Sequence, residues 1–183
     1  MQAVVDAARS GVLPVRPAVL VCNNRNAEVV SRSQQQGIPC WVLNSVTHPD
    51  PEALDQAMLA VLQSHRCDVI VLAGFMKKIG PRVLGAFQGR IINIHPSLLP
   101  KHGGQGMYGR QVHQAVLAAR ETMTGVTIHL VNAEYDEGRM LAQCEVPVAP
   151  DDTVETLAAR VLLREHAFLV ETLVLMAEGK ISL

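Results

Sequence analysis

Apolar residues in the first half of the chain occur in short uninterrupted runs, separated by stretches with helical spacing. The runs that predict buried strands are AVLVC at 18–22, CWVL at 40–43, DVIVLAGF at 68–75 and IINI at 91–94. The run at 68–75 predicts the most strongly buried strand. Amphipathic spacing predicts helices over 2–10, 26–36, 51–65 and 81–87. Strands that alternate with helices predict an α/β fold, in which a mostly parallel twisted sheet has helices on both faces.

The last third of the chain changes character. A helix is predicted over 109–119, followed by the strands GVTIHLV at 125–131 and MLAQCEVPV at 140–148, which an acidic turn at 134–138 separates. This final strand pair could run antiparallel. Thr153 opens a long helix through Met176. Two earlier helix starts also carry a cap, since Asn26 and Asp50 each precede a helical pattern.

Polar residues interrupt the apolar pattern where the run at 91–94 ends. Asn93 and His95 are two residues apart, so on a strand they project from the same face, and Pro96 ends the hydrogen-bonded ladder after them. Ligands of α/β sheets bind at the carboxyl ends of strands. An amide can stabilise an oxyanion, a histidine can carry a proton, and a carboxylate such as Asp136 can orient that histidine. Alternatively, the polar pair caps a strand end and Asp136 only forms a turn.

Composition narrows the possible classes of function. The chain has 183 residues, which suits a single domain, and its formal net charge of −1 without a basic run argues against nucleic-acid binding. No apolar stretch is long enough to span a membrane, and no secretory signal is seen. The four cysteines show no paired spacing, which indicates buried thiols rather than disulfides or a zinc site. We expect a cytoplasmic protein.

The sequence contains no other well-known catalytic motif besides the polar residues at this strand end. The chain contains neither H-E-x-x-H nor a phosphate-binding G-x-x-x-x-G-K-[ST] loop. The glycine-rich stretch GGQGMYG at 103–109 follows a proline-ended loop and not a strand. It therefore indicates a lid or a substrate-facing loop rather than a dinucleotide-binding fingerprint.

Five segments together resemble the folate-dependent formyltransferases. They are NIHPSLLP at 93–100, GVTIH at 125–129, YDEG at 135–138, DVIVLAGFMKKI at 68–79 and REHAFLVETL at 164–173. The resemblance implies a Rossmann-like fold and transfer of a formyl group from 10-formyltetrahydrofolate to the amine of glycinamide ribonucleotide, a step of purine biosynthesis, without a metal. Both partners are small molecules, and either a monomer or a homodimer is compatible.

The resemblance also assigns roles to individual residues. Asn93 and protonated His95 would stabilise the oxyanion, while Asp136 would keep His95 charged and help to move the proton. Substrate or folate contacts are implied for Gly74, Met76, Ile94, Pro96, His129, Leu141 and Glu165. Glu165 would hold the ribose hydroxyls, although a solvated charge is the commoner role of a helical glutamate. Three further histidines are expected to be structural or surface residues: His102, His113 and His166.

The chain departs from the family pattern at its start. Family members begin with a strand and a Gly-x-Gly-Ser-Asn loop that holds the ribonucleotide phosphate. This chain begins on the following helix, so we expect a single formyltransferase domain over 1–183 that is shortened at its amino terminus. The missing strand would lie between the strands at 18–22 and 68–73. Two alternatives to formyl transfer stay open, namely hydrolysis of formyltetrahydrofolate and folate binding without catalysis.

Overall fold

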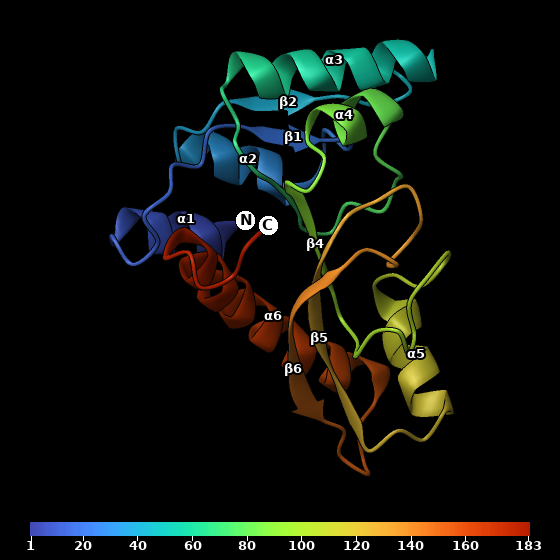
Figure 1. Cartoon of the computed structure of the whole chain (residues 1–183). Helices are drawn as coiled ribbons and strands as arrows, with labels where there is room; N and C mark the ends of the chain where they lie inside the picture. The colour runs from blue at the N-terminus through green and yellow to red at the C-terminus, as the bar shows by residue number, and fades with distance from the viewer.

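The computed structural model describes residues 1–183, in which helices and strands alternate along most of the chain (Figure 1). The helices are α1 (Gln2–Arg9), α2 (Glu28–Gln35), α3 (Pro51–Ser64), α4 (Pro81–Ala86), α5 (Arg110–Ala118) and α6 (Val154–Ala177). The strands are β1 (Leu20–Cys22), β2 (Cys40–Val42), β3 (Ile70–Leu72), β4 (Ile91–His95), β5 (Met123–Leu130) and β6 (Met140–Pro147). The predicted α/β fold is confirmed. No helix is both long enough and apolar enough to cross a membrane.

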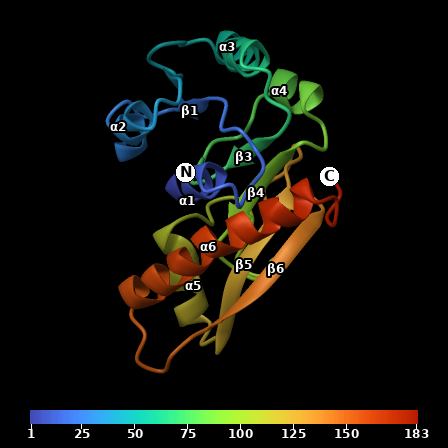
Figure 2. The same ribbon diagram turned by 90° about the vertical axis from the view of Figure 1, so that its left-hand side faces the viewer.

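The strands form two separate sheets. β1 and β2 pair in parallel, and the other four strands follow the order β3-β4-β5-β6. β3 and β4 are parallel, whereas β5 runs antiparallel to both β4 and β6. No ladder joins β1 to β3, so one edge of each of these strands has no strand partner (Figure 2).

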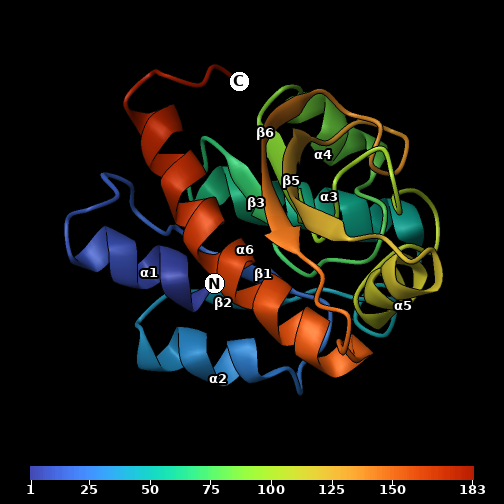
Figure 3. The ribbon, with the colours of Figure 1, turned by 90° about the horizontal axis from the view of Figure 1, so that it is seen from below.

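Helices cover both faces of the four-stranded sheet because its side chains alternate. One face packs against α3 and α4 through Ile70, Leu72 and Ile91. The opposite face packs against α6 through Val71, Ile92 and Ile94. α1 lies beside α6 on that second face (Figure 3). The larger hydrophobic core is therefore the one between α6 and strands β4 to β6.

Two local expectations are corrected by the structure. The strand predicted over 68–75 covers only Ile70–Leu72 and is half-buried, because Gly74 takes a left-handed conformation (φ +73°) that turns the chain away. Asn26 does not cap α2, since Ala27 occupies the cap position and the N–H of Asn26 bonds to the side chain of Asn24. The caps at Asp50 and Thr153 are confirmed, because both side chains accept backbone N–H groups of their helices.

Candidate active site

Asn93 and His95 lie at the end of β4 and point to the same face of the sheet, as the sequence predicts. Each has a partner across β5, because Asn93 pairs with His129 and His95 pairs with Thr127. His95 is 3% exposed and is the last residue of its strand. The paired strands β4 and β5 therefore fix the backbone positions of four polar residues of the site.

Asp136 lies between two histidines. Its Oδ2 is 3.5 Å from Nδ1 of His95, and its Oδ1 is 3.4 Å from Nε2 of His129. The amide nitrogen of Asn93 is 3.2 Å from the same Nε2 of His129. Asp136 adopts a left-handed backbone (φ +58°) in the turn between β5 and β6, and its side chain is 11% exposed. The structure thus brings together the three predicted catalytic residues.

Backbone carbonyl groups fix the proton positions on both histidines. Nε2 of His95 lies 2.9 Å from the carbonyl oxygen of His102, which can only accept a hydrogen bond, so this nitrogen carries a proton. Nδ1 of His129 is likewise 2.8 Å from the carbonyl oxygen of Leu130. The remaining nitrogen of each ring faces Asp136. Any proton that His95 gains or loses is therefore exchanged at Nδ1.

Burial and charge act in opposite directions on His95. Burial lowers the pKa of His95, and the raising effects of Asp136 and of the His102 carbonyl only partly offset it. These effects favour the neutral ring in the unliganded protein, whereas the protonated ring that the family resemblance implies belongs to the step that forms the oxyanion. Burial raises the pKa of Asp136, but its interactions with His129, His95 and the N–H of Gly104 together hold that pKa below the usual range, so the carboxyl group is ionised.

The loop after β4 is held by side chains of β5 and β6. The hydroxyl of Thr127 donates to the carbonyl of Ser97 (2.7 Å) and accepts the N–H of Leu99 (3.1 Å). The amide of Gln143 donates to both Thr127 Oγ1 (2.8 Å) and the Leu99 carbonyl (3.2 Å). These buried bonds satisfy loop groups that would otherwise lack partners. They give the loop a fixed position relative to His95.

Comparison with known proteins identifies the family. Residues 1–173 match the family model described as formyl transferase. Phosphoribosylglycinamide formyltransferase of Haemophilus influenzae is 36% identical over 185 residues, which cover 100% of this chain and 84% of that protein. The chain belongs to the formyl transferase family.

Solved structures agree with this family assignment. Glycinamide ribonucleotide transformylase 1 of Symbiobacterium toebii superposes with a TM-score of 0.90 at 36% identity, covering 97% of this chain and 82% of that one. The chloroplastic phosphoribosylglycinamide formyltransferase of Vigna unguiculata is 41% identical over 96% of this chain, which spans only 56% of that protein's length. A formyltetrahydrofolate deformylase of Pseudomonas syringae, at 23% identity and a TM-score of 0.86, shares the fold.

Gly74 and Met76, two of the residues that the family resemblance implies, follow β3 toward the acidic turn. Met76 is 55% exposed. Two residues further on, the ammonium group of Lys78 donates to the carbonyl of Ala133 (2.8 Å) and lies 5.0 Å from the ring centre of Tyr135. These contacts place the segment after β3 beside the turn that carries the site's carboxylate.

Ile94 and Leu141 turn their side chains away from the site formed by Asn93, His95 and Asp136. Both pack against the larger core. The register between β5 and β6 shifts between Ile128 and His129, which leaves Leu141 as the extra residue of a bulge. Pro96 is partly buried just after the end of β4. The family resemblance implies that these three residues contact a ligand, Leu141 through its backbone groups. Those contacts remain predictions.

Glu165 is not a solvated helix charge. It lies on the buried side of α6, one turn from Val161 and one turn from Leu169, both of which are core residues. Burial raises the pKa of Glu165 to about 7, and no hydrogen bond or ion pair compensates for that burial. A partly buried carboxylate without a partner is costly, so a ligand that supplies hydrogen bonds would stabilise it.

Three other histidines interact with the residues of this site. His129 was assigned a supporting place, but it contacts both Asn93 and Asp136. His102 and His113 were expected to be structural or surface residues. His102 contributes its carbonyl to His95, and His113 is buried on α5, where burial and the charge of His95 lower its pKa. Strand alternation could have revealed His129, since it lies two residues after Thr127 in β5.

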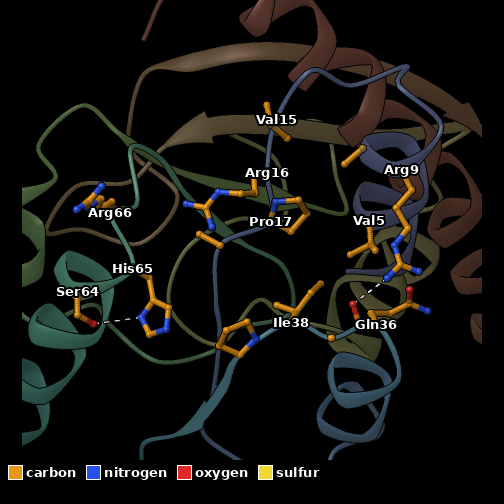
Figure 4. Close-up of a pocket in the computed structure, with 14 residues that line it drawn as sticks. Val5, Arg9, Val15, Arg16, Pro17, Gln36, Ile38, Ser64, His65 and Arg66 are labelled. Carbon is orange, nitrogen blue, oxygen red and sulfur yellow. Dashed lines mark hydrogen bonds between the residues drawn. The ribbon is translucent and has the colours of Figure 1, made fainter.

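A cavity of about 640 Å³ lies away from this cluster (Figure 4). Its walls come from α1 and from the segments that precede β1, β2 and β3, and they include three arginines and no acidic residue: Arg9, Arg16 and Arg66. It therefore adjoins the amino ends of the strands, whereas the Asn93, His95 and Asp136 cluster lies at the carboxyl end of β4.

Proposed function

We propose that this chain transfers a formyl group from 10-formyltetrahydrofolate to the amine of glycinamide ribonucleotide. The observation that carries the proposal is the arrangement of Asn93, His95 and Asp136, in which an ionised carboxylate faces the one exchangeable nitrogen of a buried histidine. The names of the family relatives support the same reaction. No step of the chemistry requires a metal.

The reaction begins when the amine attacks the formyl carbon and forms a tetrahedral intermediate with an oxyanion and a positively charged nitrogen. Asn93, whose side-chain amide lies beside His129, donates an N–H to the oxyanion. Neutral His95 accepts the surplus amine proton at Nδ1, through a water molecule, and becomes an imidazolium next to the oxyanion. Asp136 stabilises that imidazolium. An oxyanion donor is typically worth roughly 3 kcal/mol.

Breakdown of the intermediate returns this proton. As the bond between the formyl carbon and the folate nitrogen breaks, the imidazolium of His95 gives the proton to the leaving nitrogen, and the ring is neutral again. Proton shuttles of this kind contribute about 10²–10⁴-fold in rate. The ring neither gains nor loses a proton over the cycle, which agrees with its neutral resting form.

Substrate binding follows from the positions of the remaining residues. Gly74 and Met76 lie on the segment beside the acidic turn and would contact both substrates. Ile94, Pro96 and Leu141 would offer backbone groups to the pterin ring, with His129 behind them. Glu165 would accept hydrogen bonds from the ribose hydroxyls, which would give its carboxylate the partners that it lacks in the unliganded protein.

A single assay separates this function from its two alternatives. The purified chain is mixed with 10-formyltetrahydrofolate, with and without glycinamide ribonucleotide, and both tetrahydrofolate and formylated product are measured. Formyl transfer that requires the ribonucleotide supports the proposal. Tetrahydrofolate release without the ribonucleotide indicates a hydrolase, and folate binding without turnover indicates a binding protein. Either of these last two outcomes overturns the proposal.

A further inference from the structure

Three consecutive loop residues contact both members of the His95–Asp136 pair. The carbonyl of His102 accepts the Nε2 proton of His95 at 2.9 Å, and the N–H of Gly104 donates to Oδ2 of Asp136 at 2.9 Å. Between them, Gly103 packs so closely that a Cβ atom there would lie 3.4 Å from Cβ of Asp136 and would collide with the side chain of Leu99. All these contacts to the pair use backbone atoms.

The backbone shape of this segment requires particular residues. His102 adopts a left-handed conformation (φ +56°), and Gly104 has φ +91°, which side chains other than that of glycine rarely allow. With these angles, the carbonyl of His102 and the N–H of Gly104 both point toward the His95–Asp136 pair. The glycine-rich composition at 103–104 is therefore explained by the pair's geometry as well as by loop flexibility.

The segment is anchored independently of the pair. The hydroxyl of Ser97 donates to the carbonyl of Lys101 (2.6 Å), and the ammonium of Lys101 contacts both oxygens of Glu121 (3.0 and 3.1 Å). Ser97 is in turn held by Thr127 of β5. Hydrogen bonds thus connect β5 to the loop and the loop to the His95–Asp136 pair, so the loop can position the pair.

We infer that the backbone of residues 102–104 is a positioning element, which selects Nδ1 as the reactive nitrogen of His95 and keeps Asp136 beside it. This inference rests on the proposed function. Without the His102 carbonyl, the ring of His95 could hold its proton on either nitrogen, and Nδ1 would no longer be selected as the reactive one. Without the Gly104 N–H, the carboxylate would lose the one backbone donor that fixes its orientation.

The titration of His95 reports on the position of this loop. Burial lowers the pKa of His95 most, Asp136 and the bond to the His102 carbonyl raise it, and the neighbouring histidines His129 and His102 lower it. On α5, His113 also senses the charge of His95. A loop that moves away from the pair weakens the bond to the His102 carbonyl and the burial of the ring together. The midpoint of the His95 titration should therefore move away from its parental value.

Two glycines of the same loop provide a matched test. Gly104 and Gly106 have similar angles (φ +91° and +88°), and neither would have an atom within 4 Å of an added Cβ. Only Gly104 bonds to Asp136. Gly104→Ala and Gly106→Ala therefore introduce similar backbone strain, but only the first displaces a contact of the pair. We expect Gly104→Ala to lower kcat roughly tenfold to a hundredfold and Gly106→Ala to leave it within about twofold.

Histidine NMR titrations of the unliganded protein give a readout that does not depend on turnover. The His95 midpoint should shift in Gly104→Ala and stay at the parental value in Gly106→Ala. Equal effects of the two glycine substitutions on kcat and on the titration would overturn the positioning role. If the parent transfers no formyl group while the titrations differ as expected, the proposed function fails and the positioning element stands.

Discussion

The two sheets of this protein differ in how firmly they hold their side chains. In the four-stranded sheet, the eight-residue strand β5 pairs with β4 over residues 127–130 and with β6 over residues 123–129, and six consecutive residues of β5 are buried. In the two-stranded sheet, each strand has three residues, only Cys22 is buried and Trp41 is 48% exposed. All the proposed catalytic groups lie on the four-stranded sheet or on its turns. Groups that must stay within fractions of an ångström are located where two ladders and a core fix the backbone.

The smaller sheet has a physical reason to be less stable. Parallel pairs are slightly weaker per residue than antiparallel pairs and are normally buried on both faces and edges. Here β1 and β3 each have an edge without a strand partner, and the cavity of about 640 Å³ adjoins the amino ends of these strands. A buried backbone group without a partner costs about 1–3 kcal/mol. The further strand that we expect between residues 18–22 and 68–73 stays a prediction. The unpaired edges of β1 and β3 allow it to be tested.

The largest expected effect is on catalysis in the four-stranded sheet. His95→Ala and Asp136→Asn should each reduce kcat by about 10²-fold or more, because each removes the proton carrier or the group that stabilises its charged form. Steady-state kinetics and thermal melting test this. His166→Ala and Asp151→Asn are matched controls, since both residues are exposed. A folded His95→Ala protein with near-parental kcat would show that the site is misassigned.

The second effect concerns the open edges of the smaller sheet. Fusing a strand and a Gly-Ser-Asn loop of a family member to the amino terminus should stabilise the protein by a few kcal/mol, because several unpaired backbone groups gain partners. Ribonucleotide affinity should also increase, since the loop supplies amides for the phosphate. Differential scanning calorimetry and ligand titration provide the measurements. A flexible Gly/Ser extension of equal length is the control, and equal melting temperatures for the two fusions would contradict the prediction.

A third effect connects stability with pH through Glu165. Its pKa is about 7 in the folded protein and 4.5 in the reference state, so above pH 4.5 the unfolded chain binds fewer protons than the folded one. Stability from this group therefore falls as the pH rises from 4.5 to 7, by an amount on the order of 2–3 kcal/mol. Glu165→Gln should remove that loss. The mutant should melt at a higher temperature than the parent at pH 8 and at the same temperature at pH 4.5.

A substitution of Glu165 should also affect the affinities for the two substrates differently. Glu165→Gln should weaken the binding of glycinamide ribonucleotide more than the binding of folate, as measured by titration calorimetry. Glu145→Gln, which changes an exposed glutamate of β6, is the control for both experiments. Equal losses of affinity for the two ligands would remove Glu165 from the ribose site.

The smallest expected effect uses the only tryptophan of the chain as a probe. Trp41 lies on β2, so its fluorescence reports on the two-stranded sheet, whereas far-ultraviolet circular dichroism reports mainly on the helices. If the smaller sheet opens first, the fluorescence midpoint in urea should precede the dichroism midpoint by about 1 M or less. Coincident midpoints would show that the two sheets unfold as one unit, and the contrast between them would then concern geometry and not stability.

Much of this structure could be predicted from the sequence because local patterns determine it. The capped starts of α3 and α6, the strand that ends at His95 and the meeting of that strand with the acidic turn all follow from residue type and spacing. The length of β3 was not predictable in this way, since an apolar run does not show that the chain will turn at Gly74. The lowered pKa of His95 was not predictable from the sequence either. It depends on the balance between burial and a carboxylate, which only the packed structure sets.

The bonds from His95 and His129 to backbone carbonyls have a consequence for protein engineering. Grafting the side chains of Asn93, His95 and Asp136 onto another scaffold would copy the residues that a sequence comparison can see. It would omit the two carbonyl oxygens, which belong to the backbone of His102 and of Leu130 and not to their side chains. A designer would have to transplant a loop and a strand end as rigid pieces. The smallest portable version of this site is therefore a set of backbone paths, and its three side chains alone would not reproduce it.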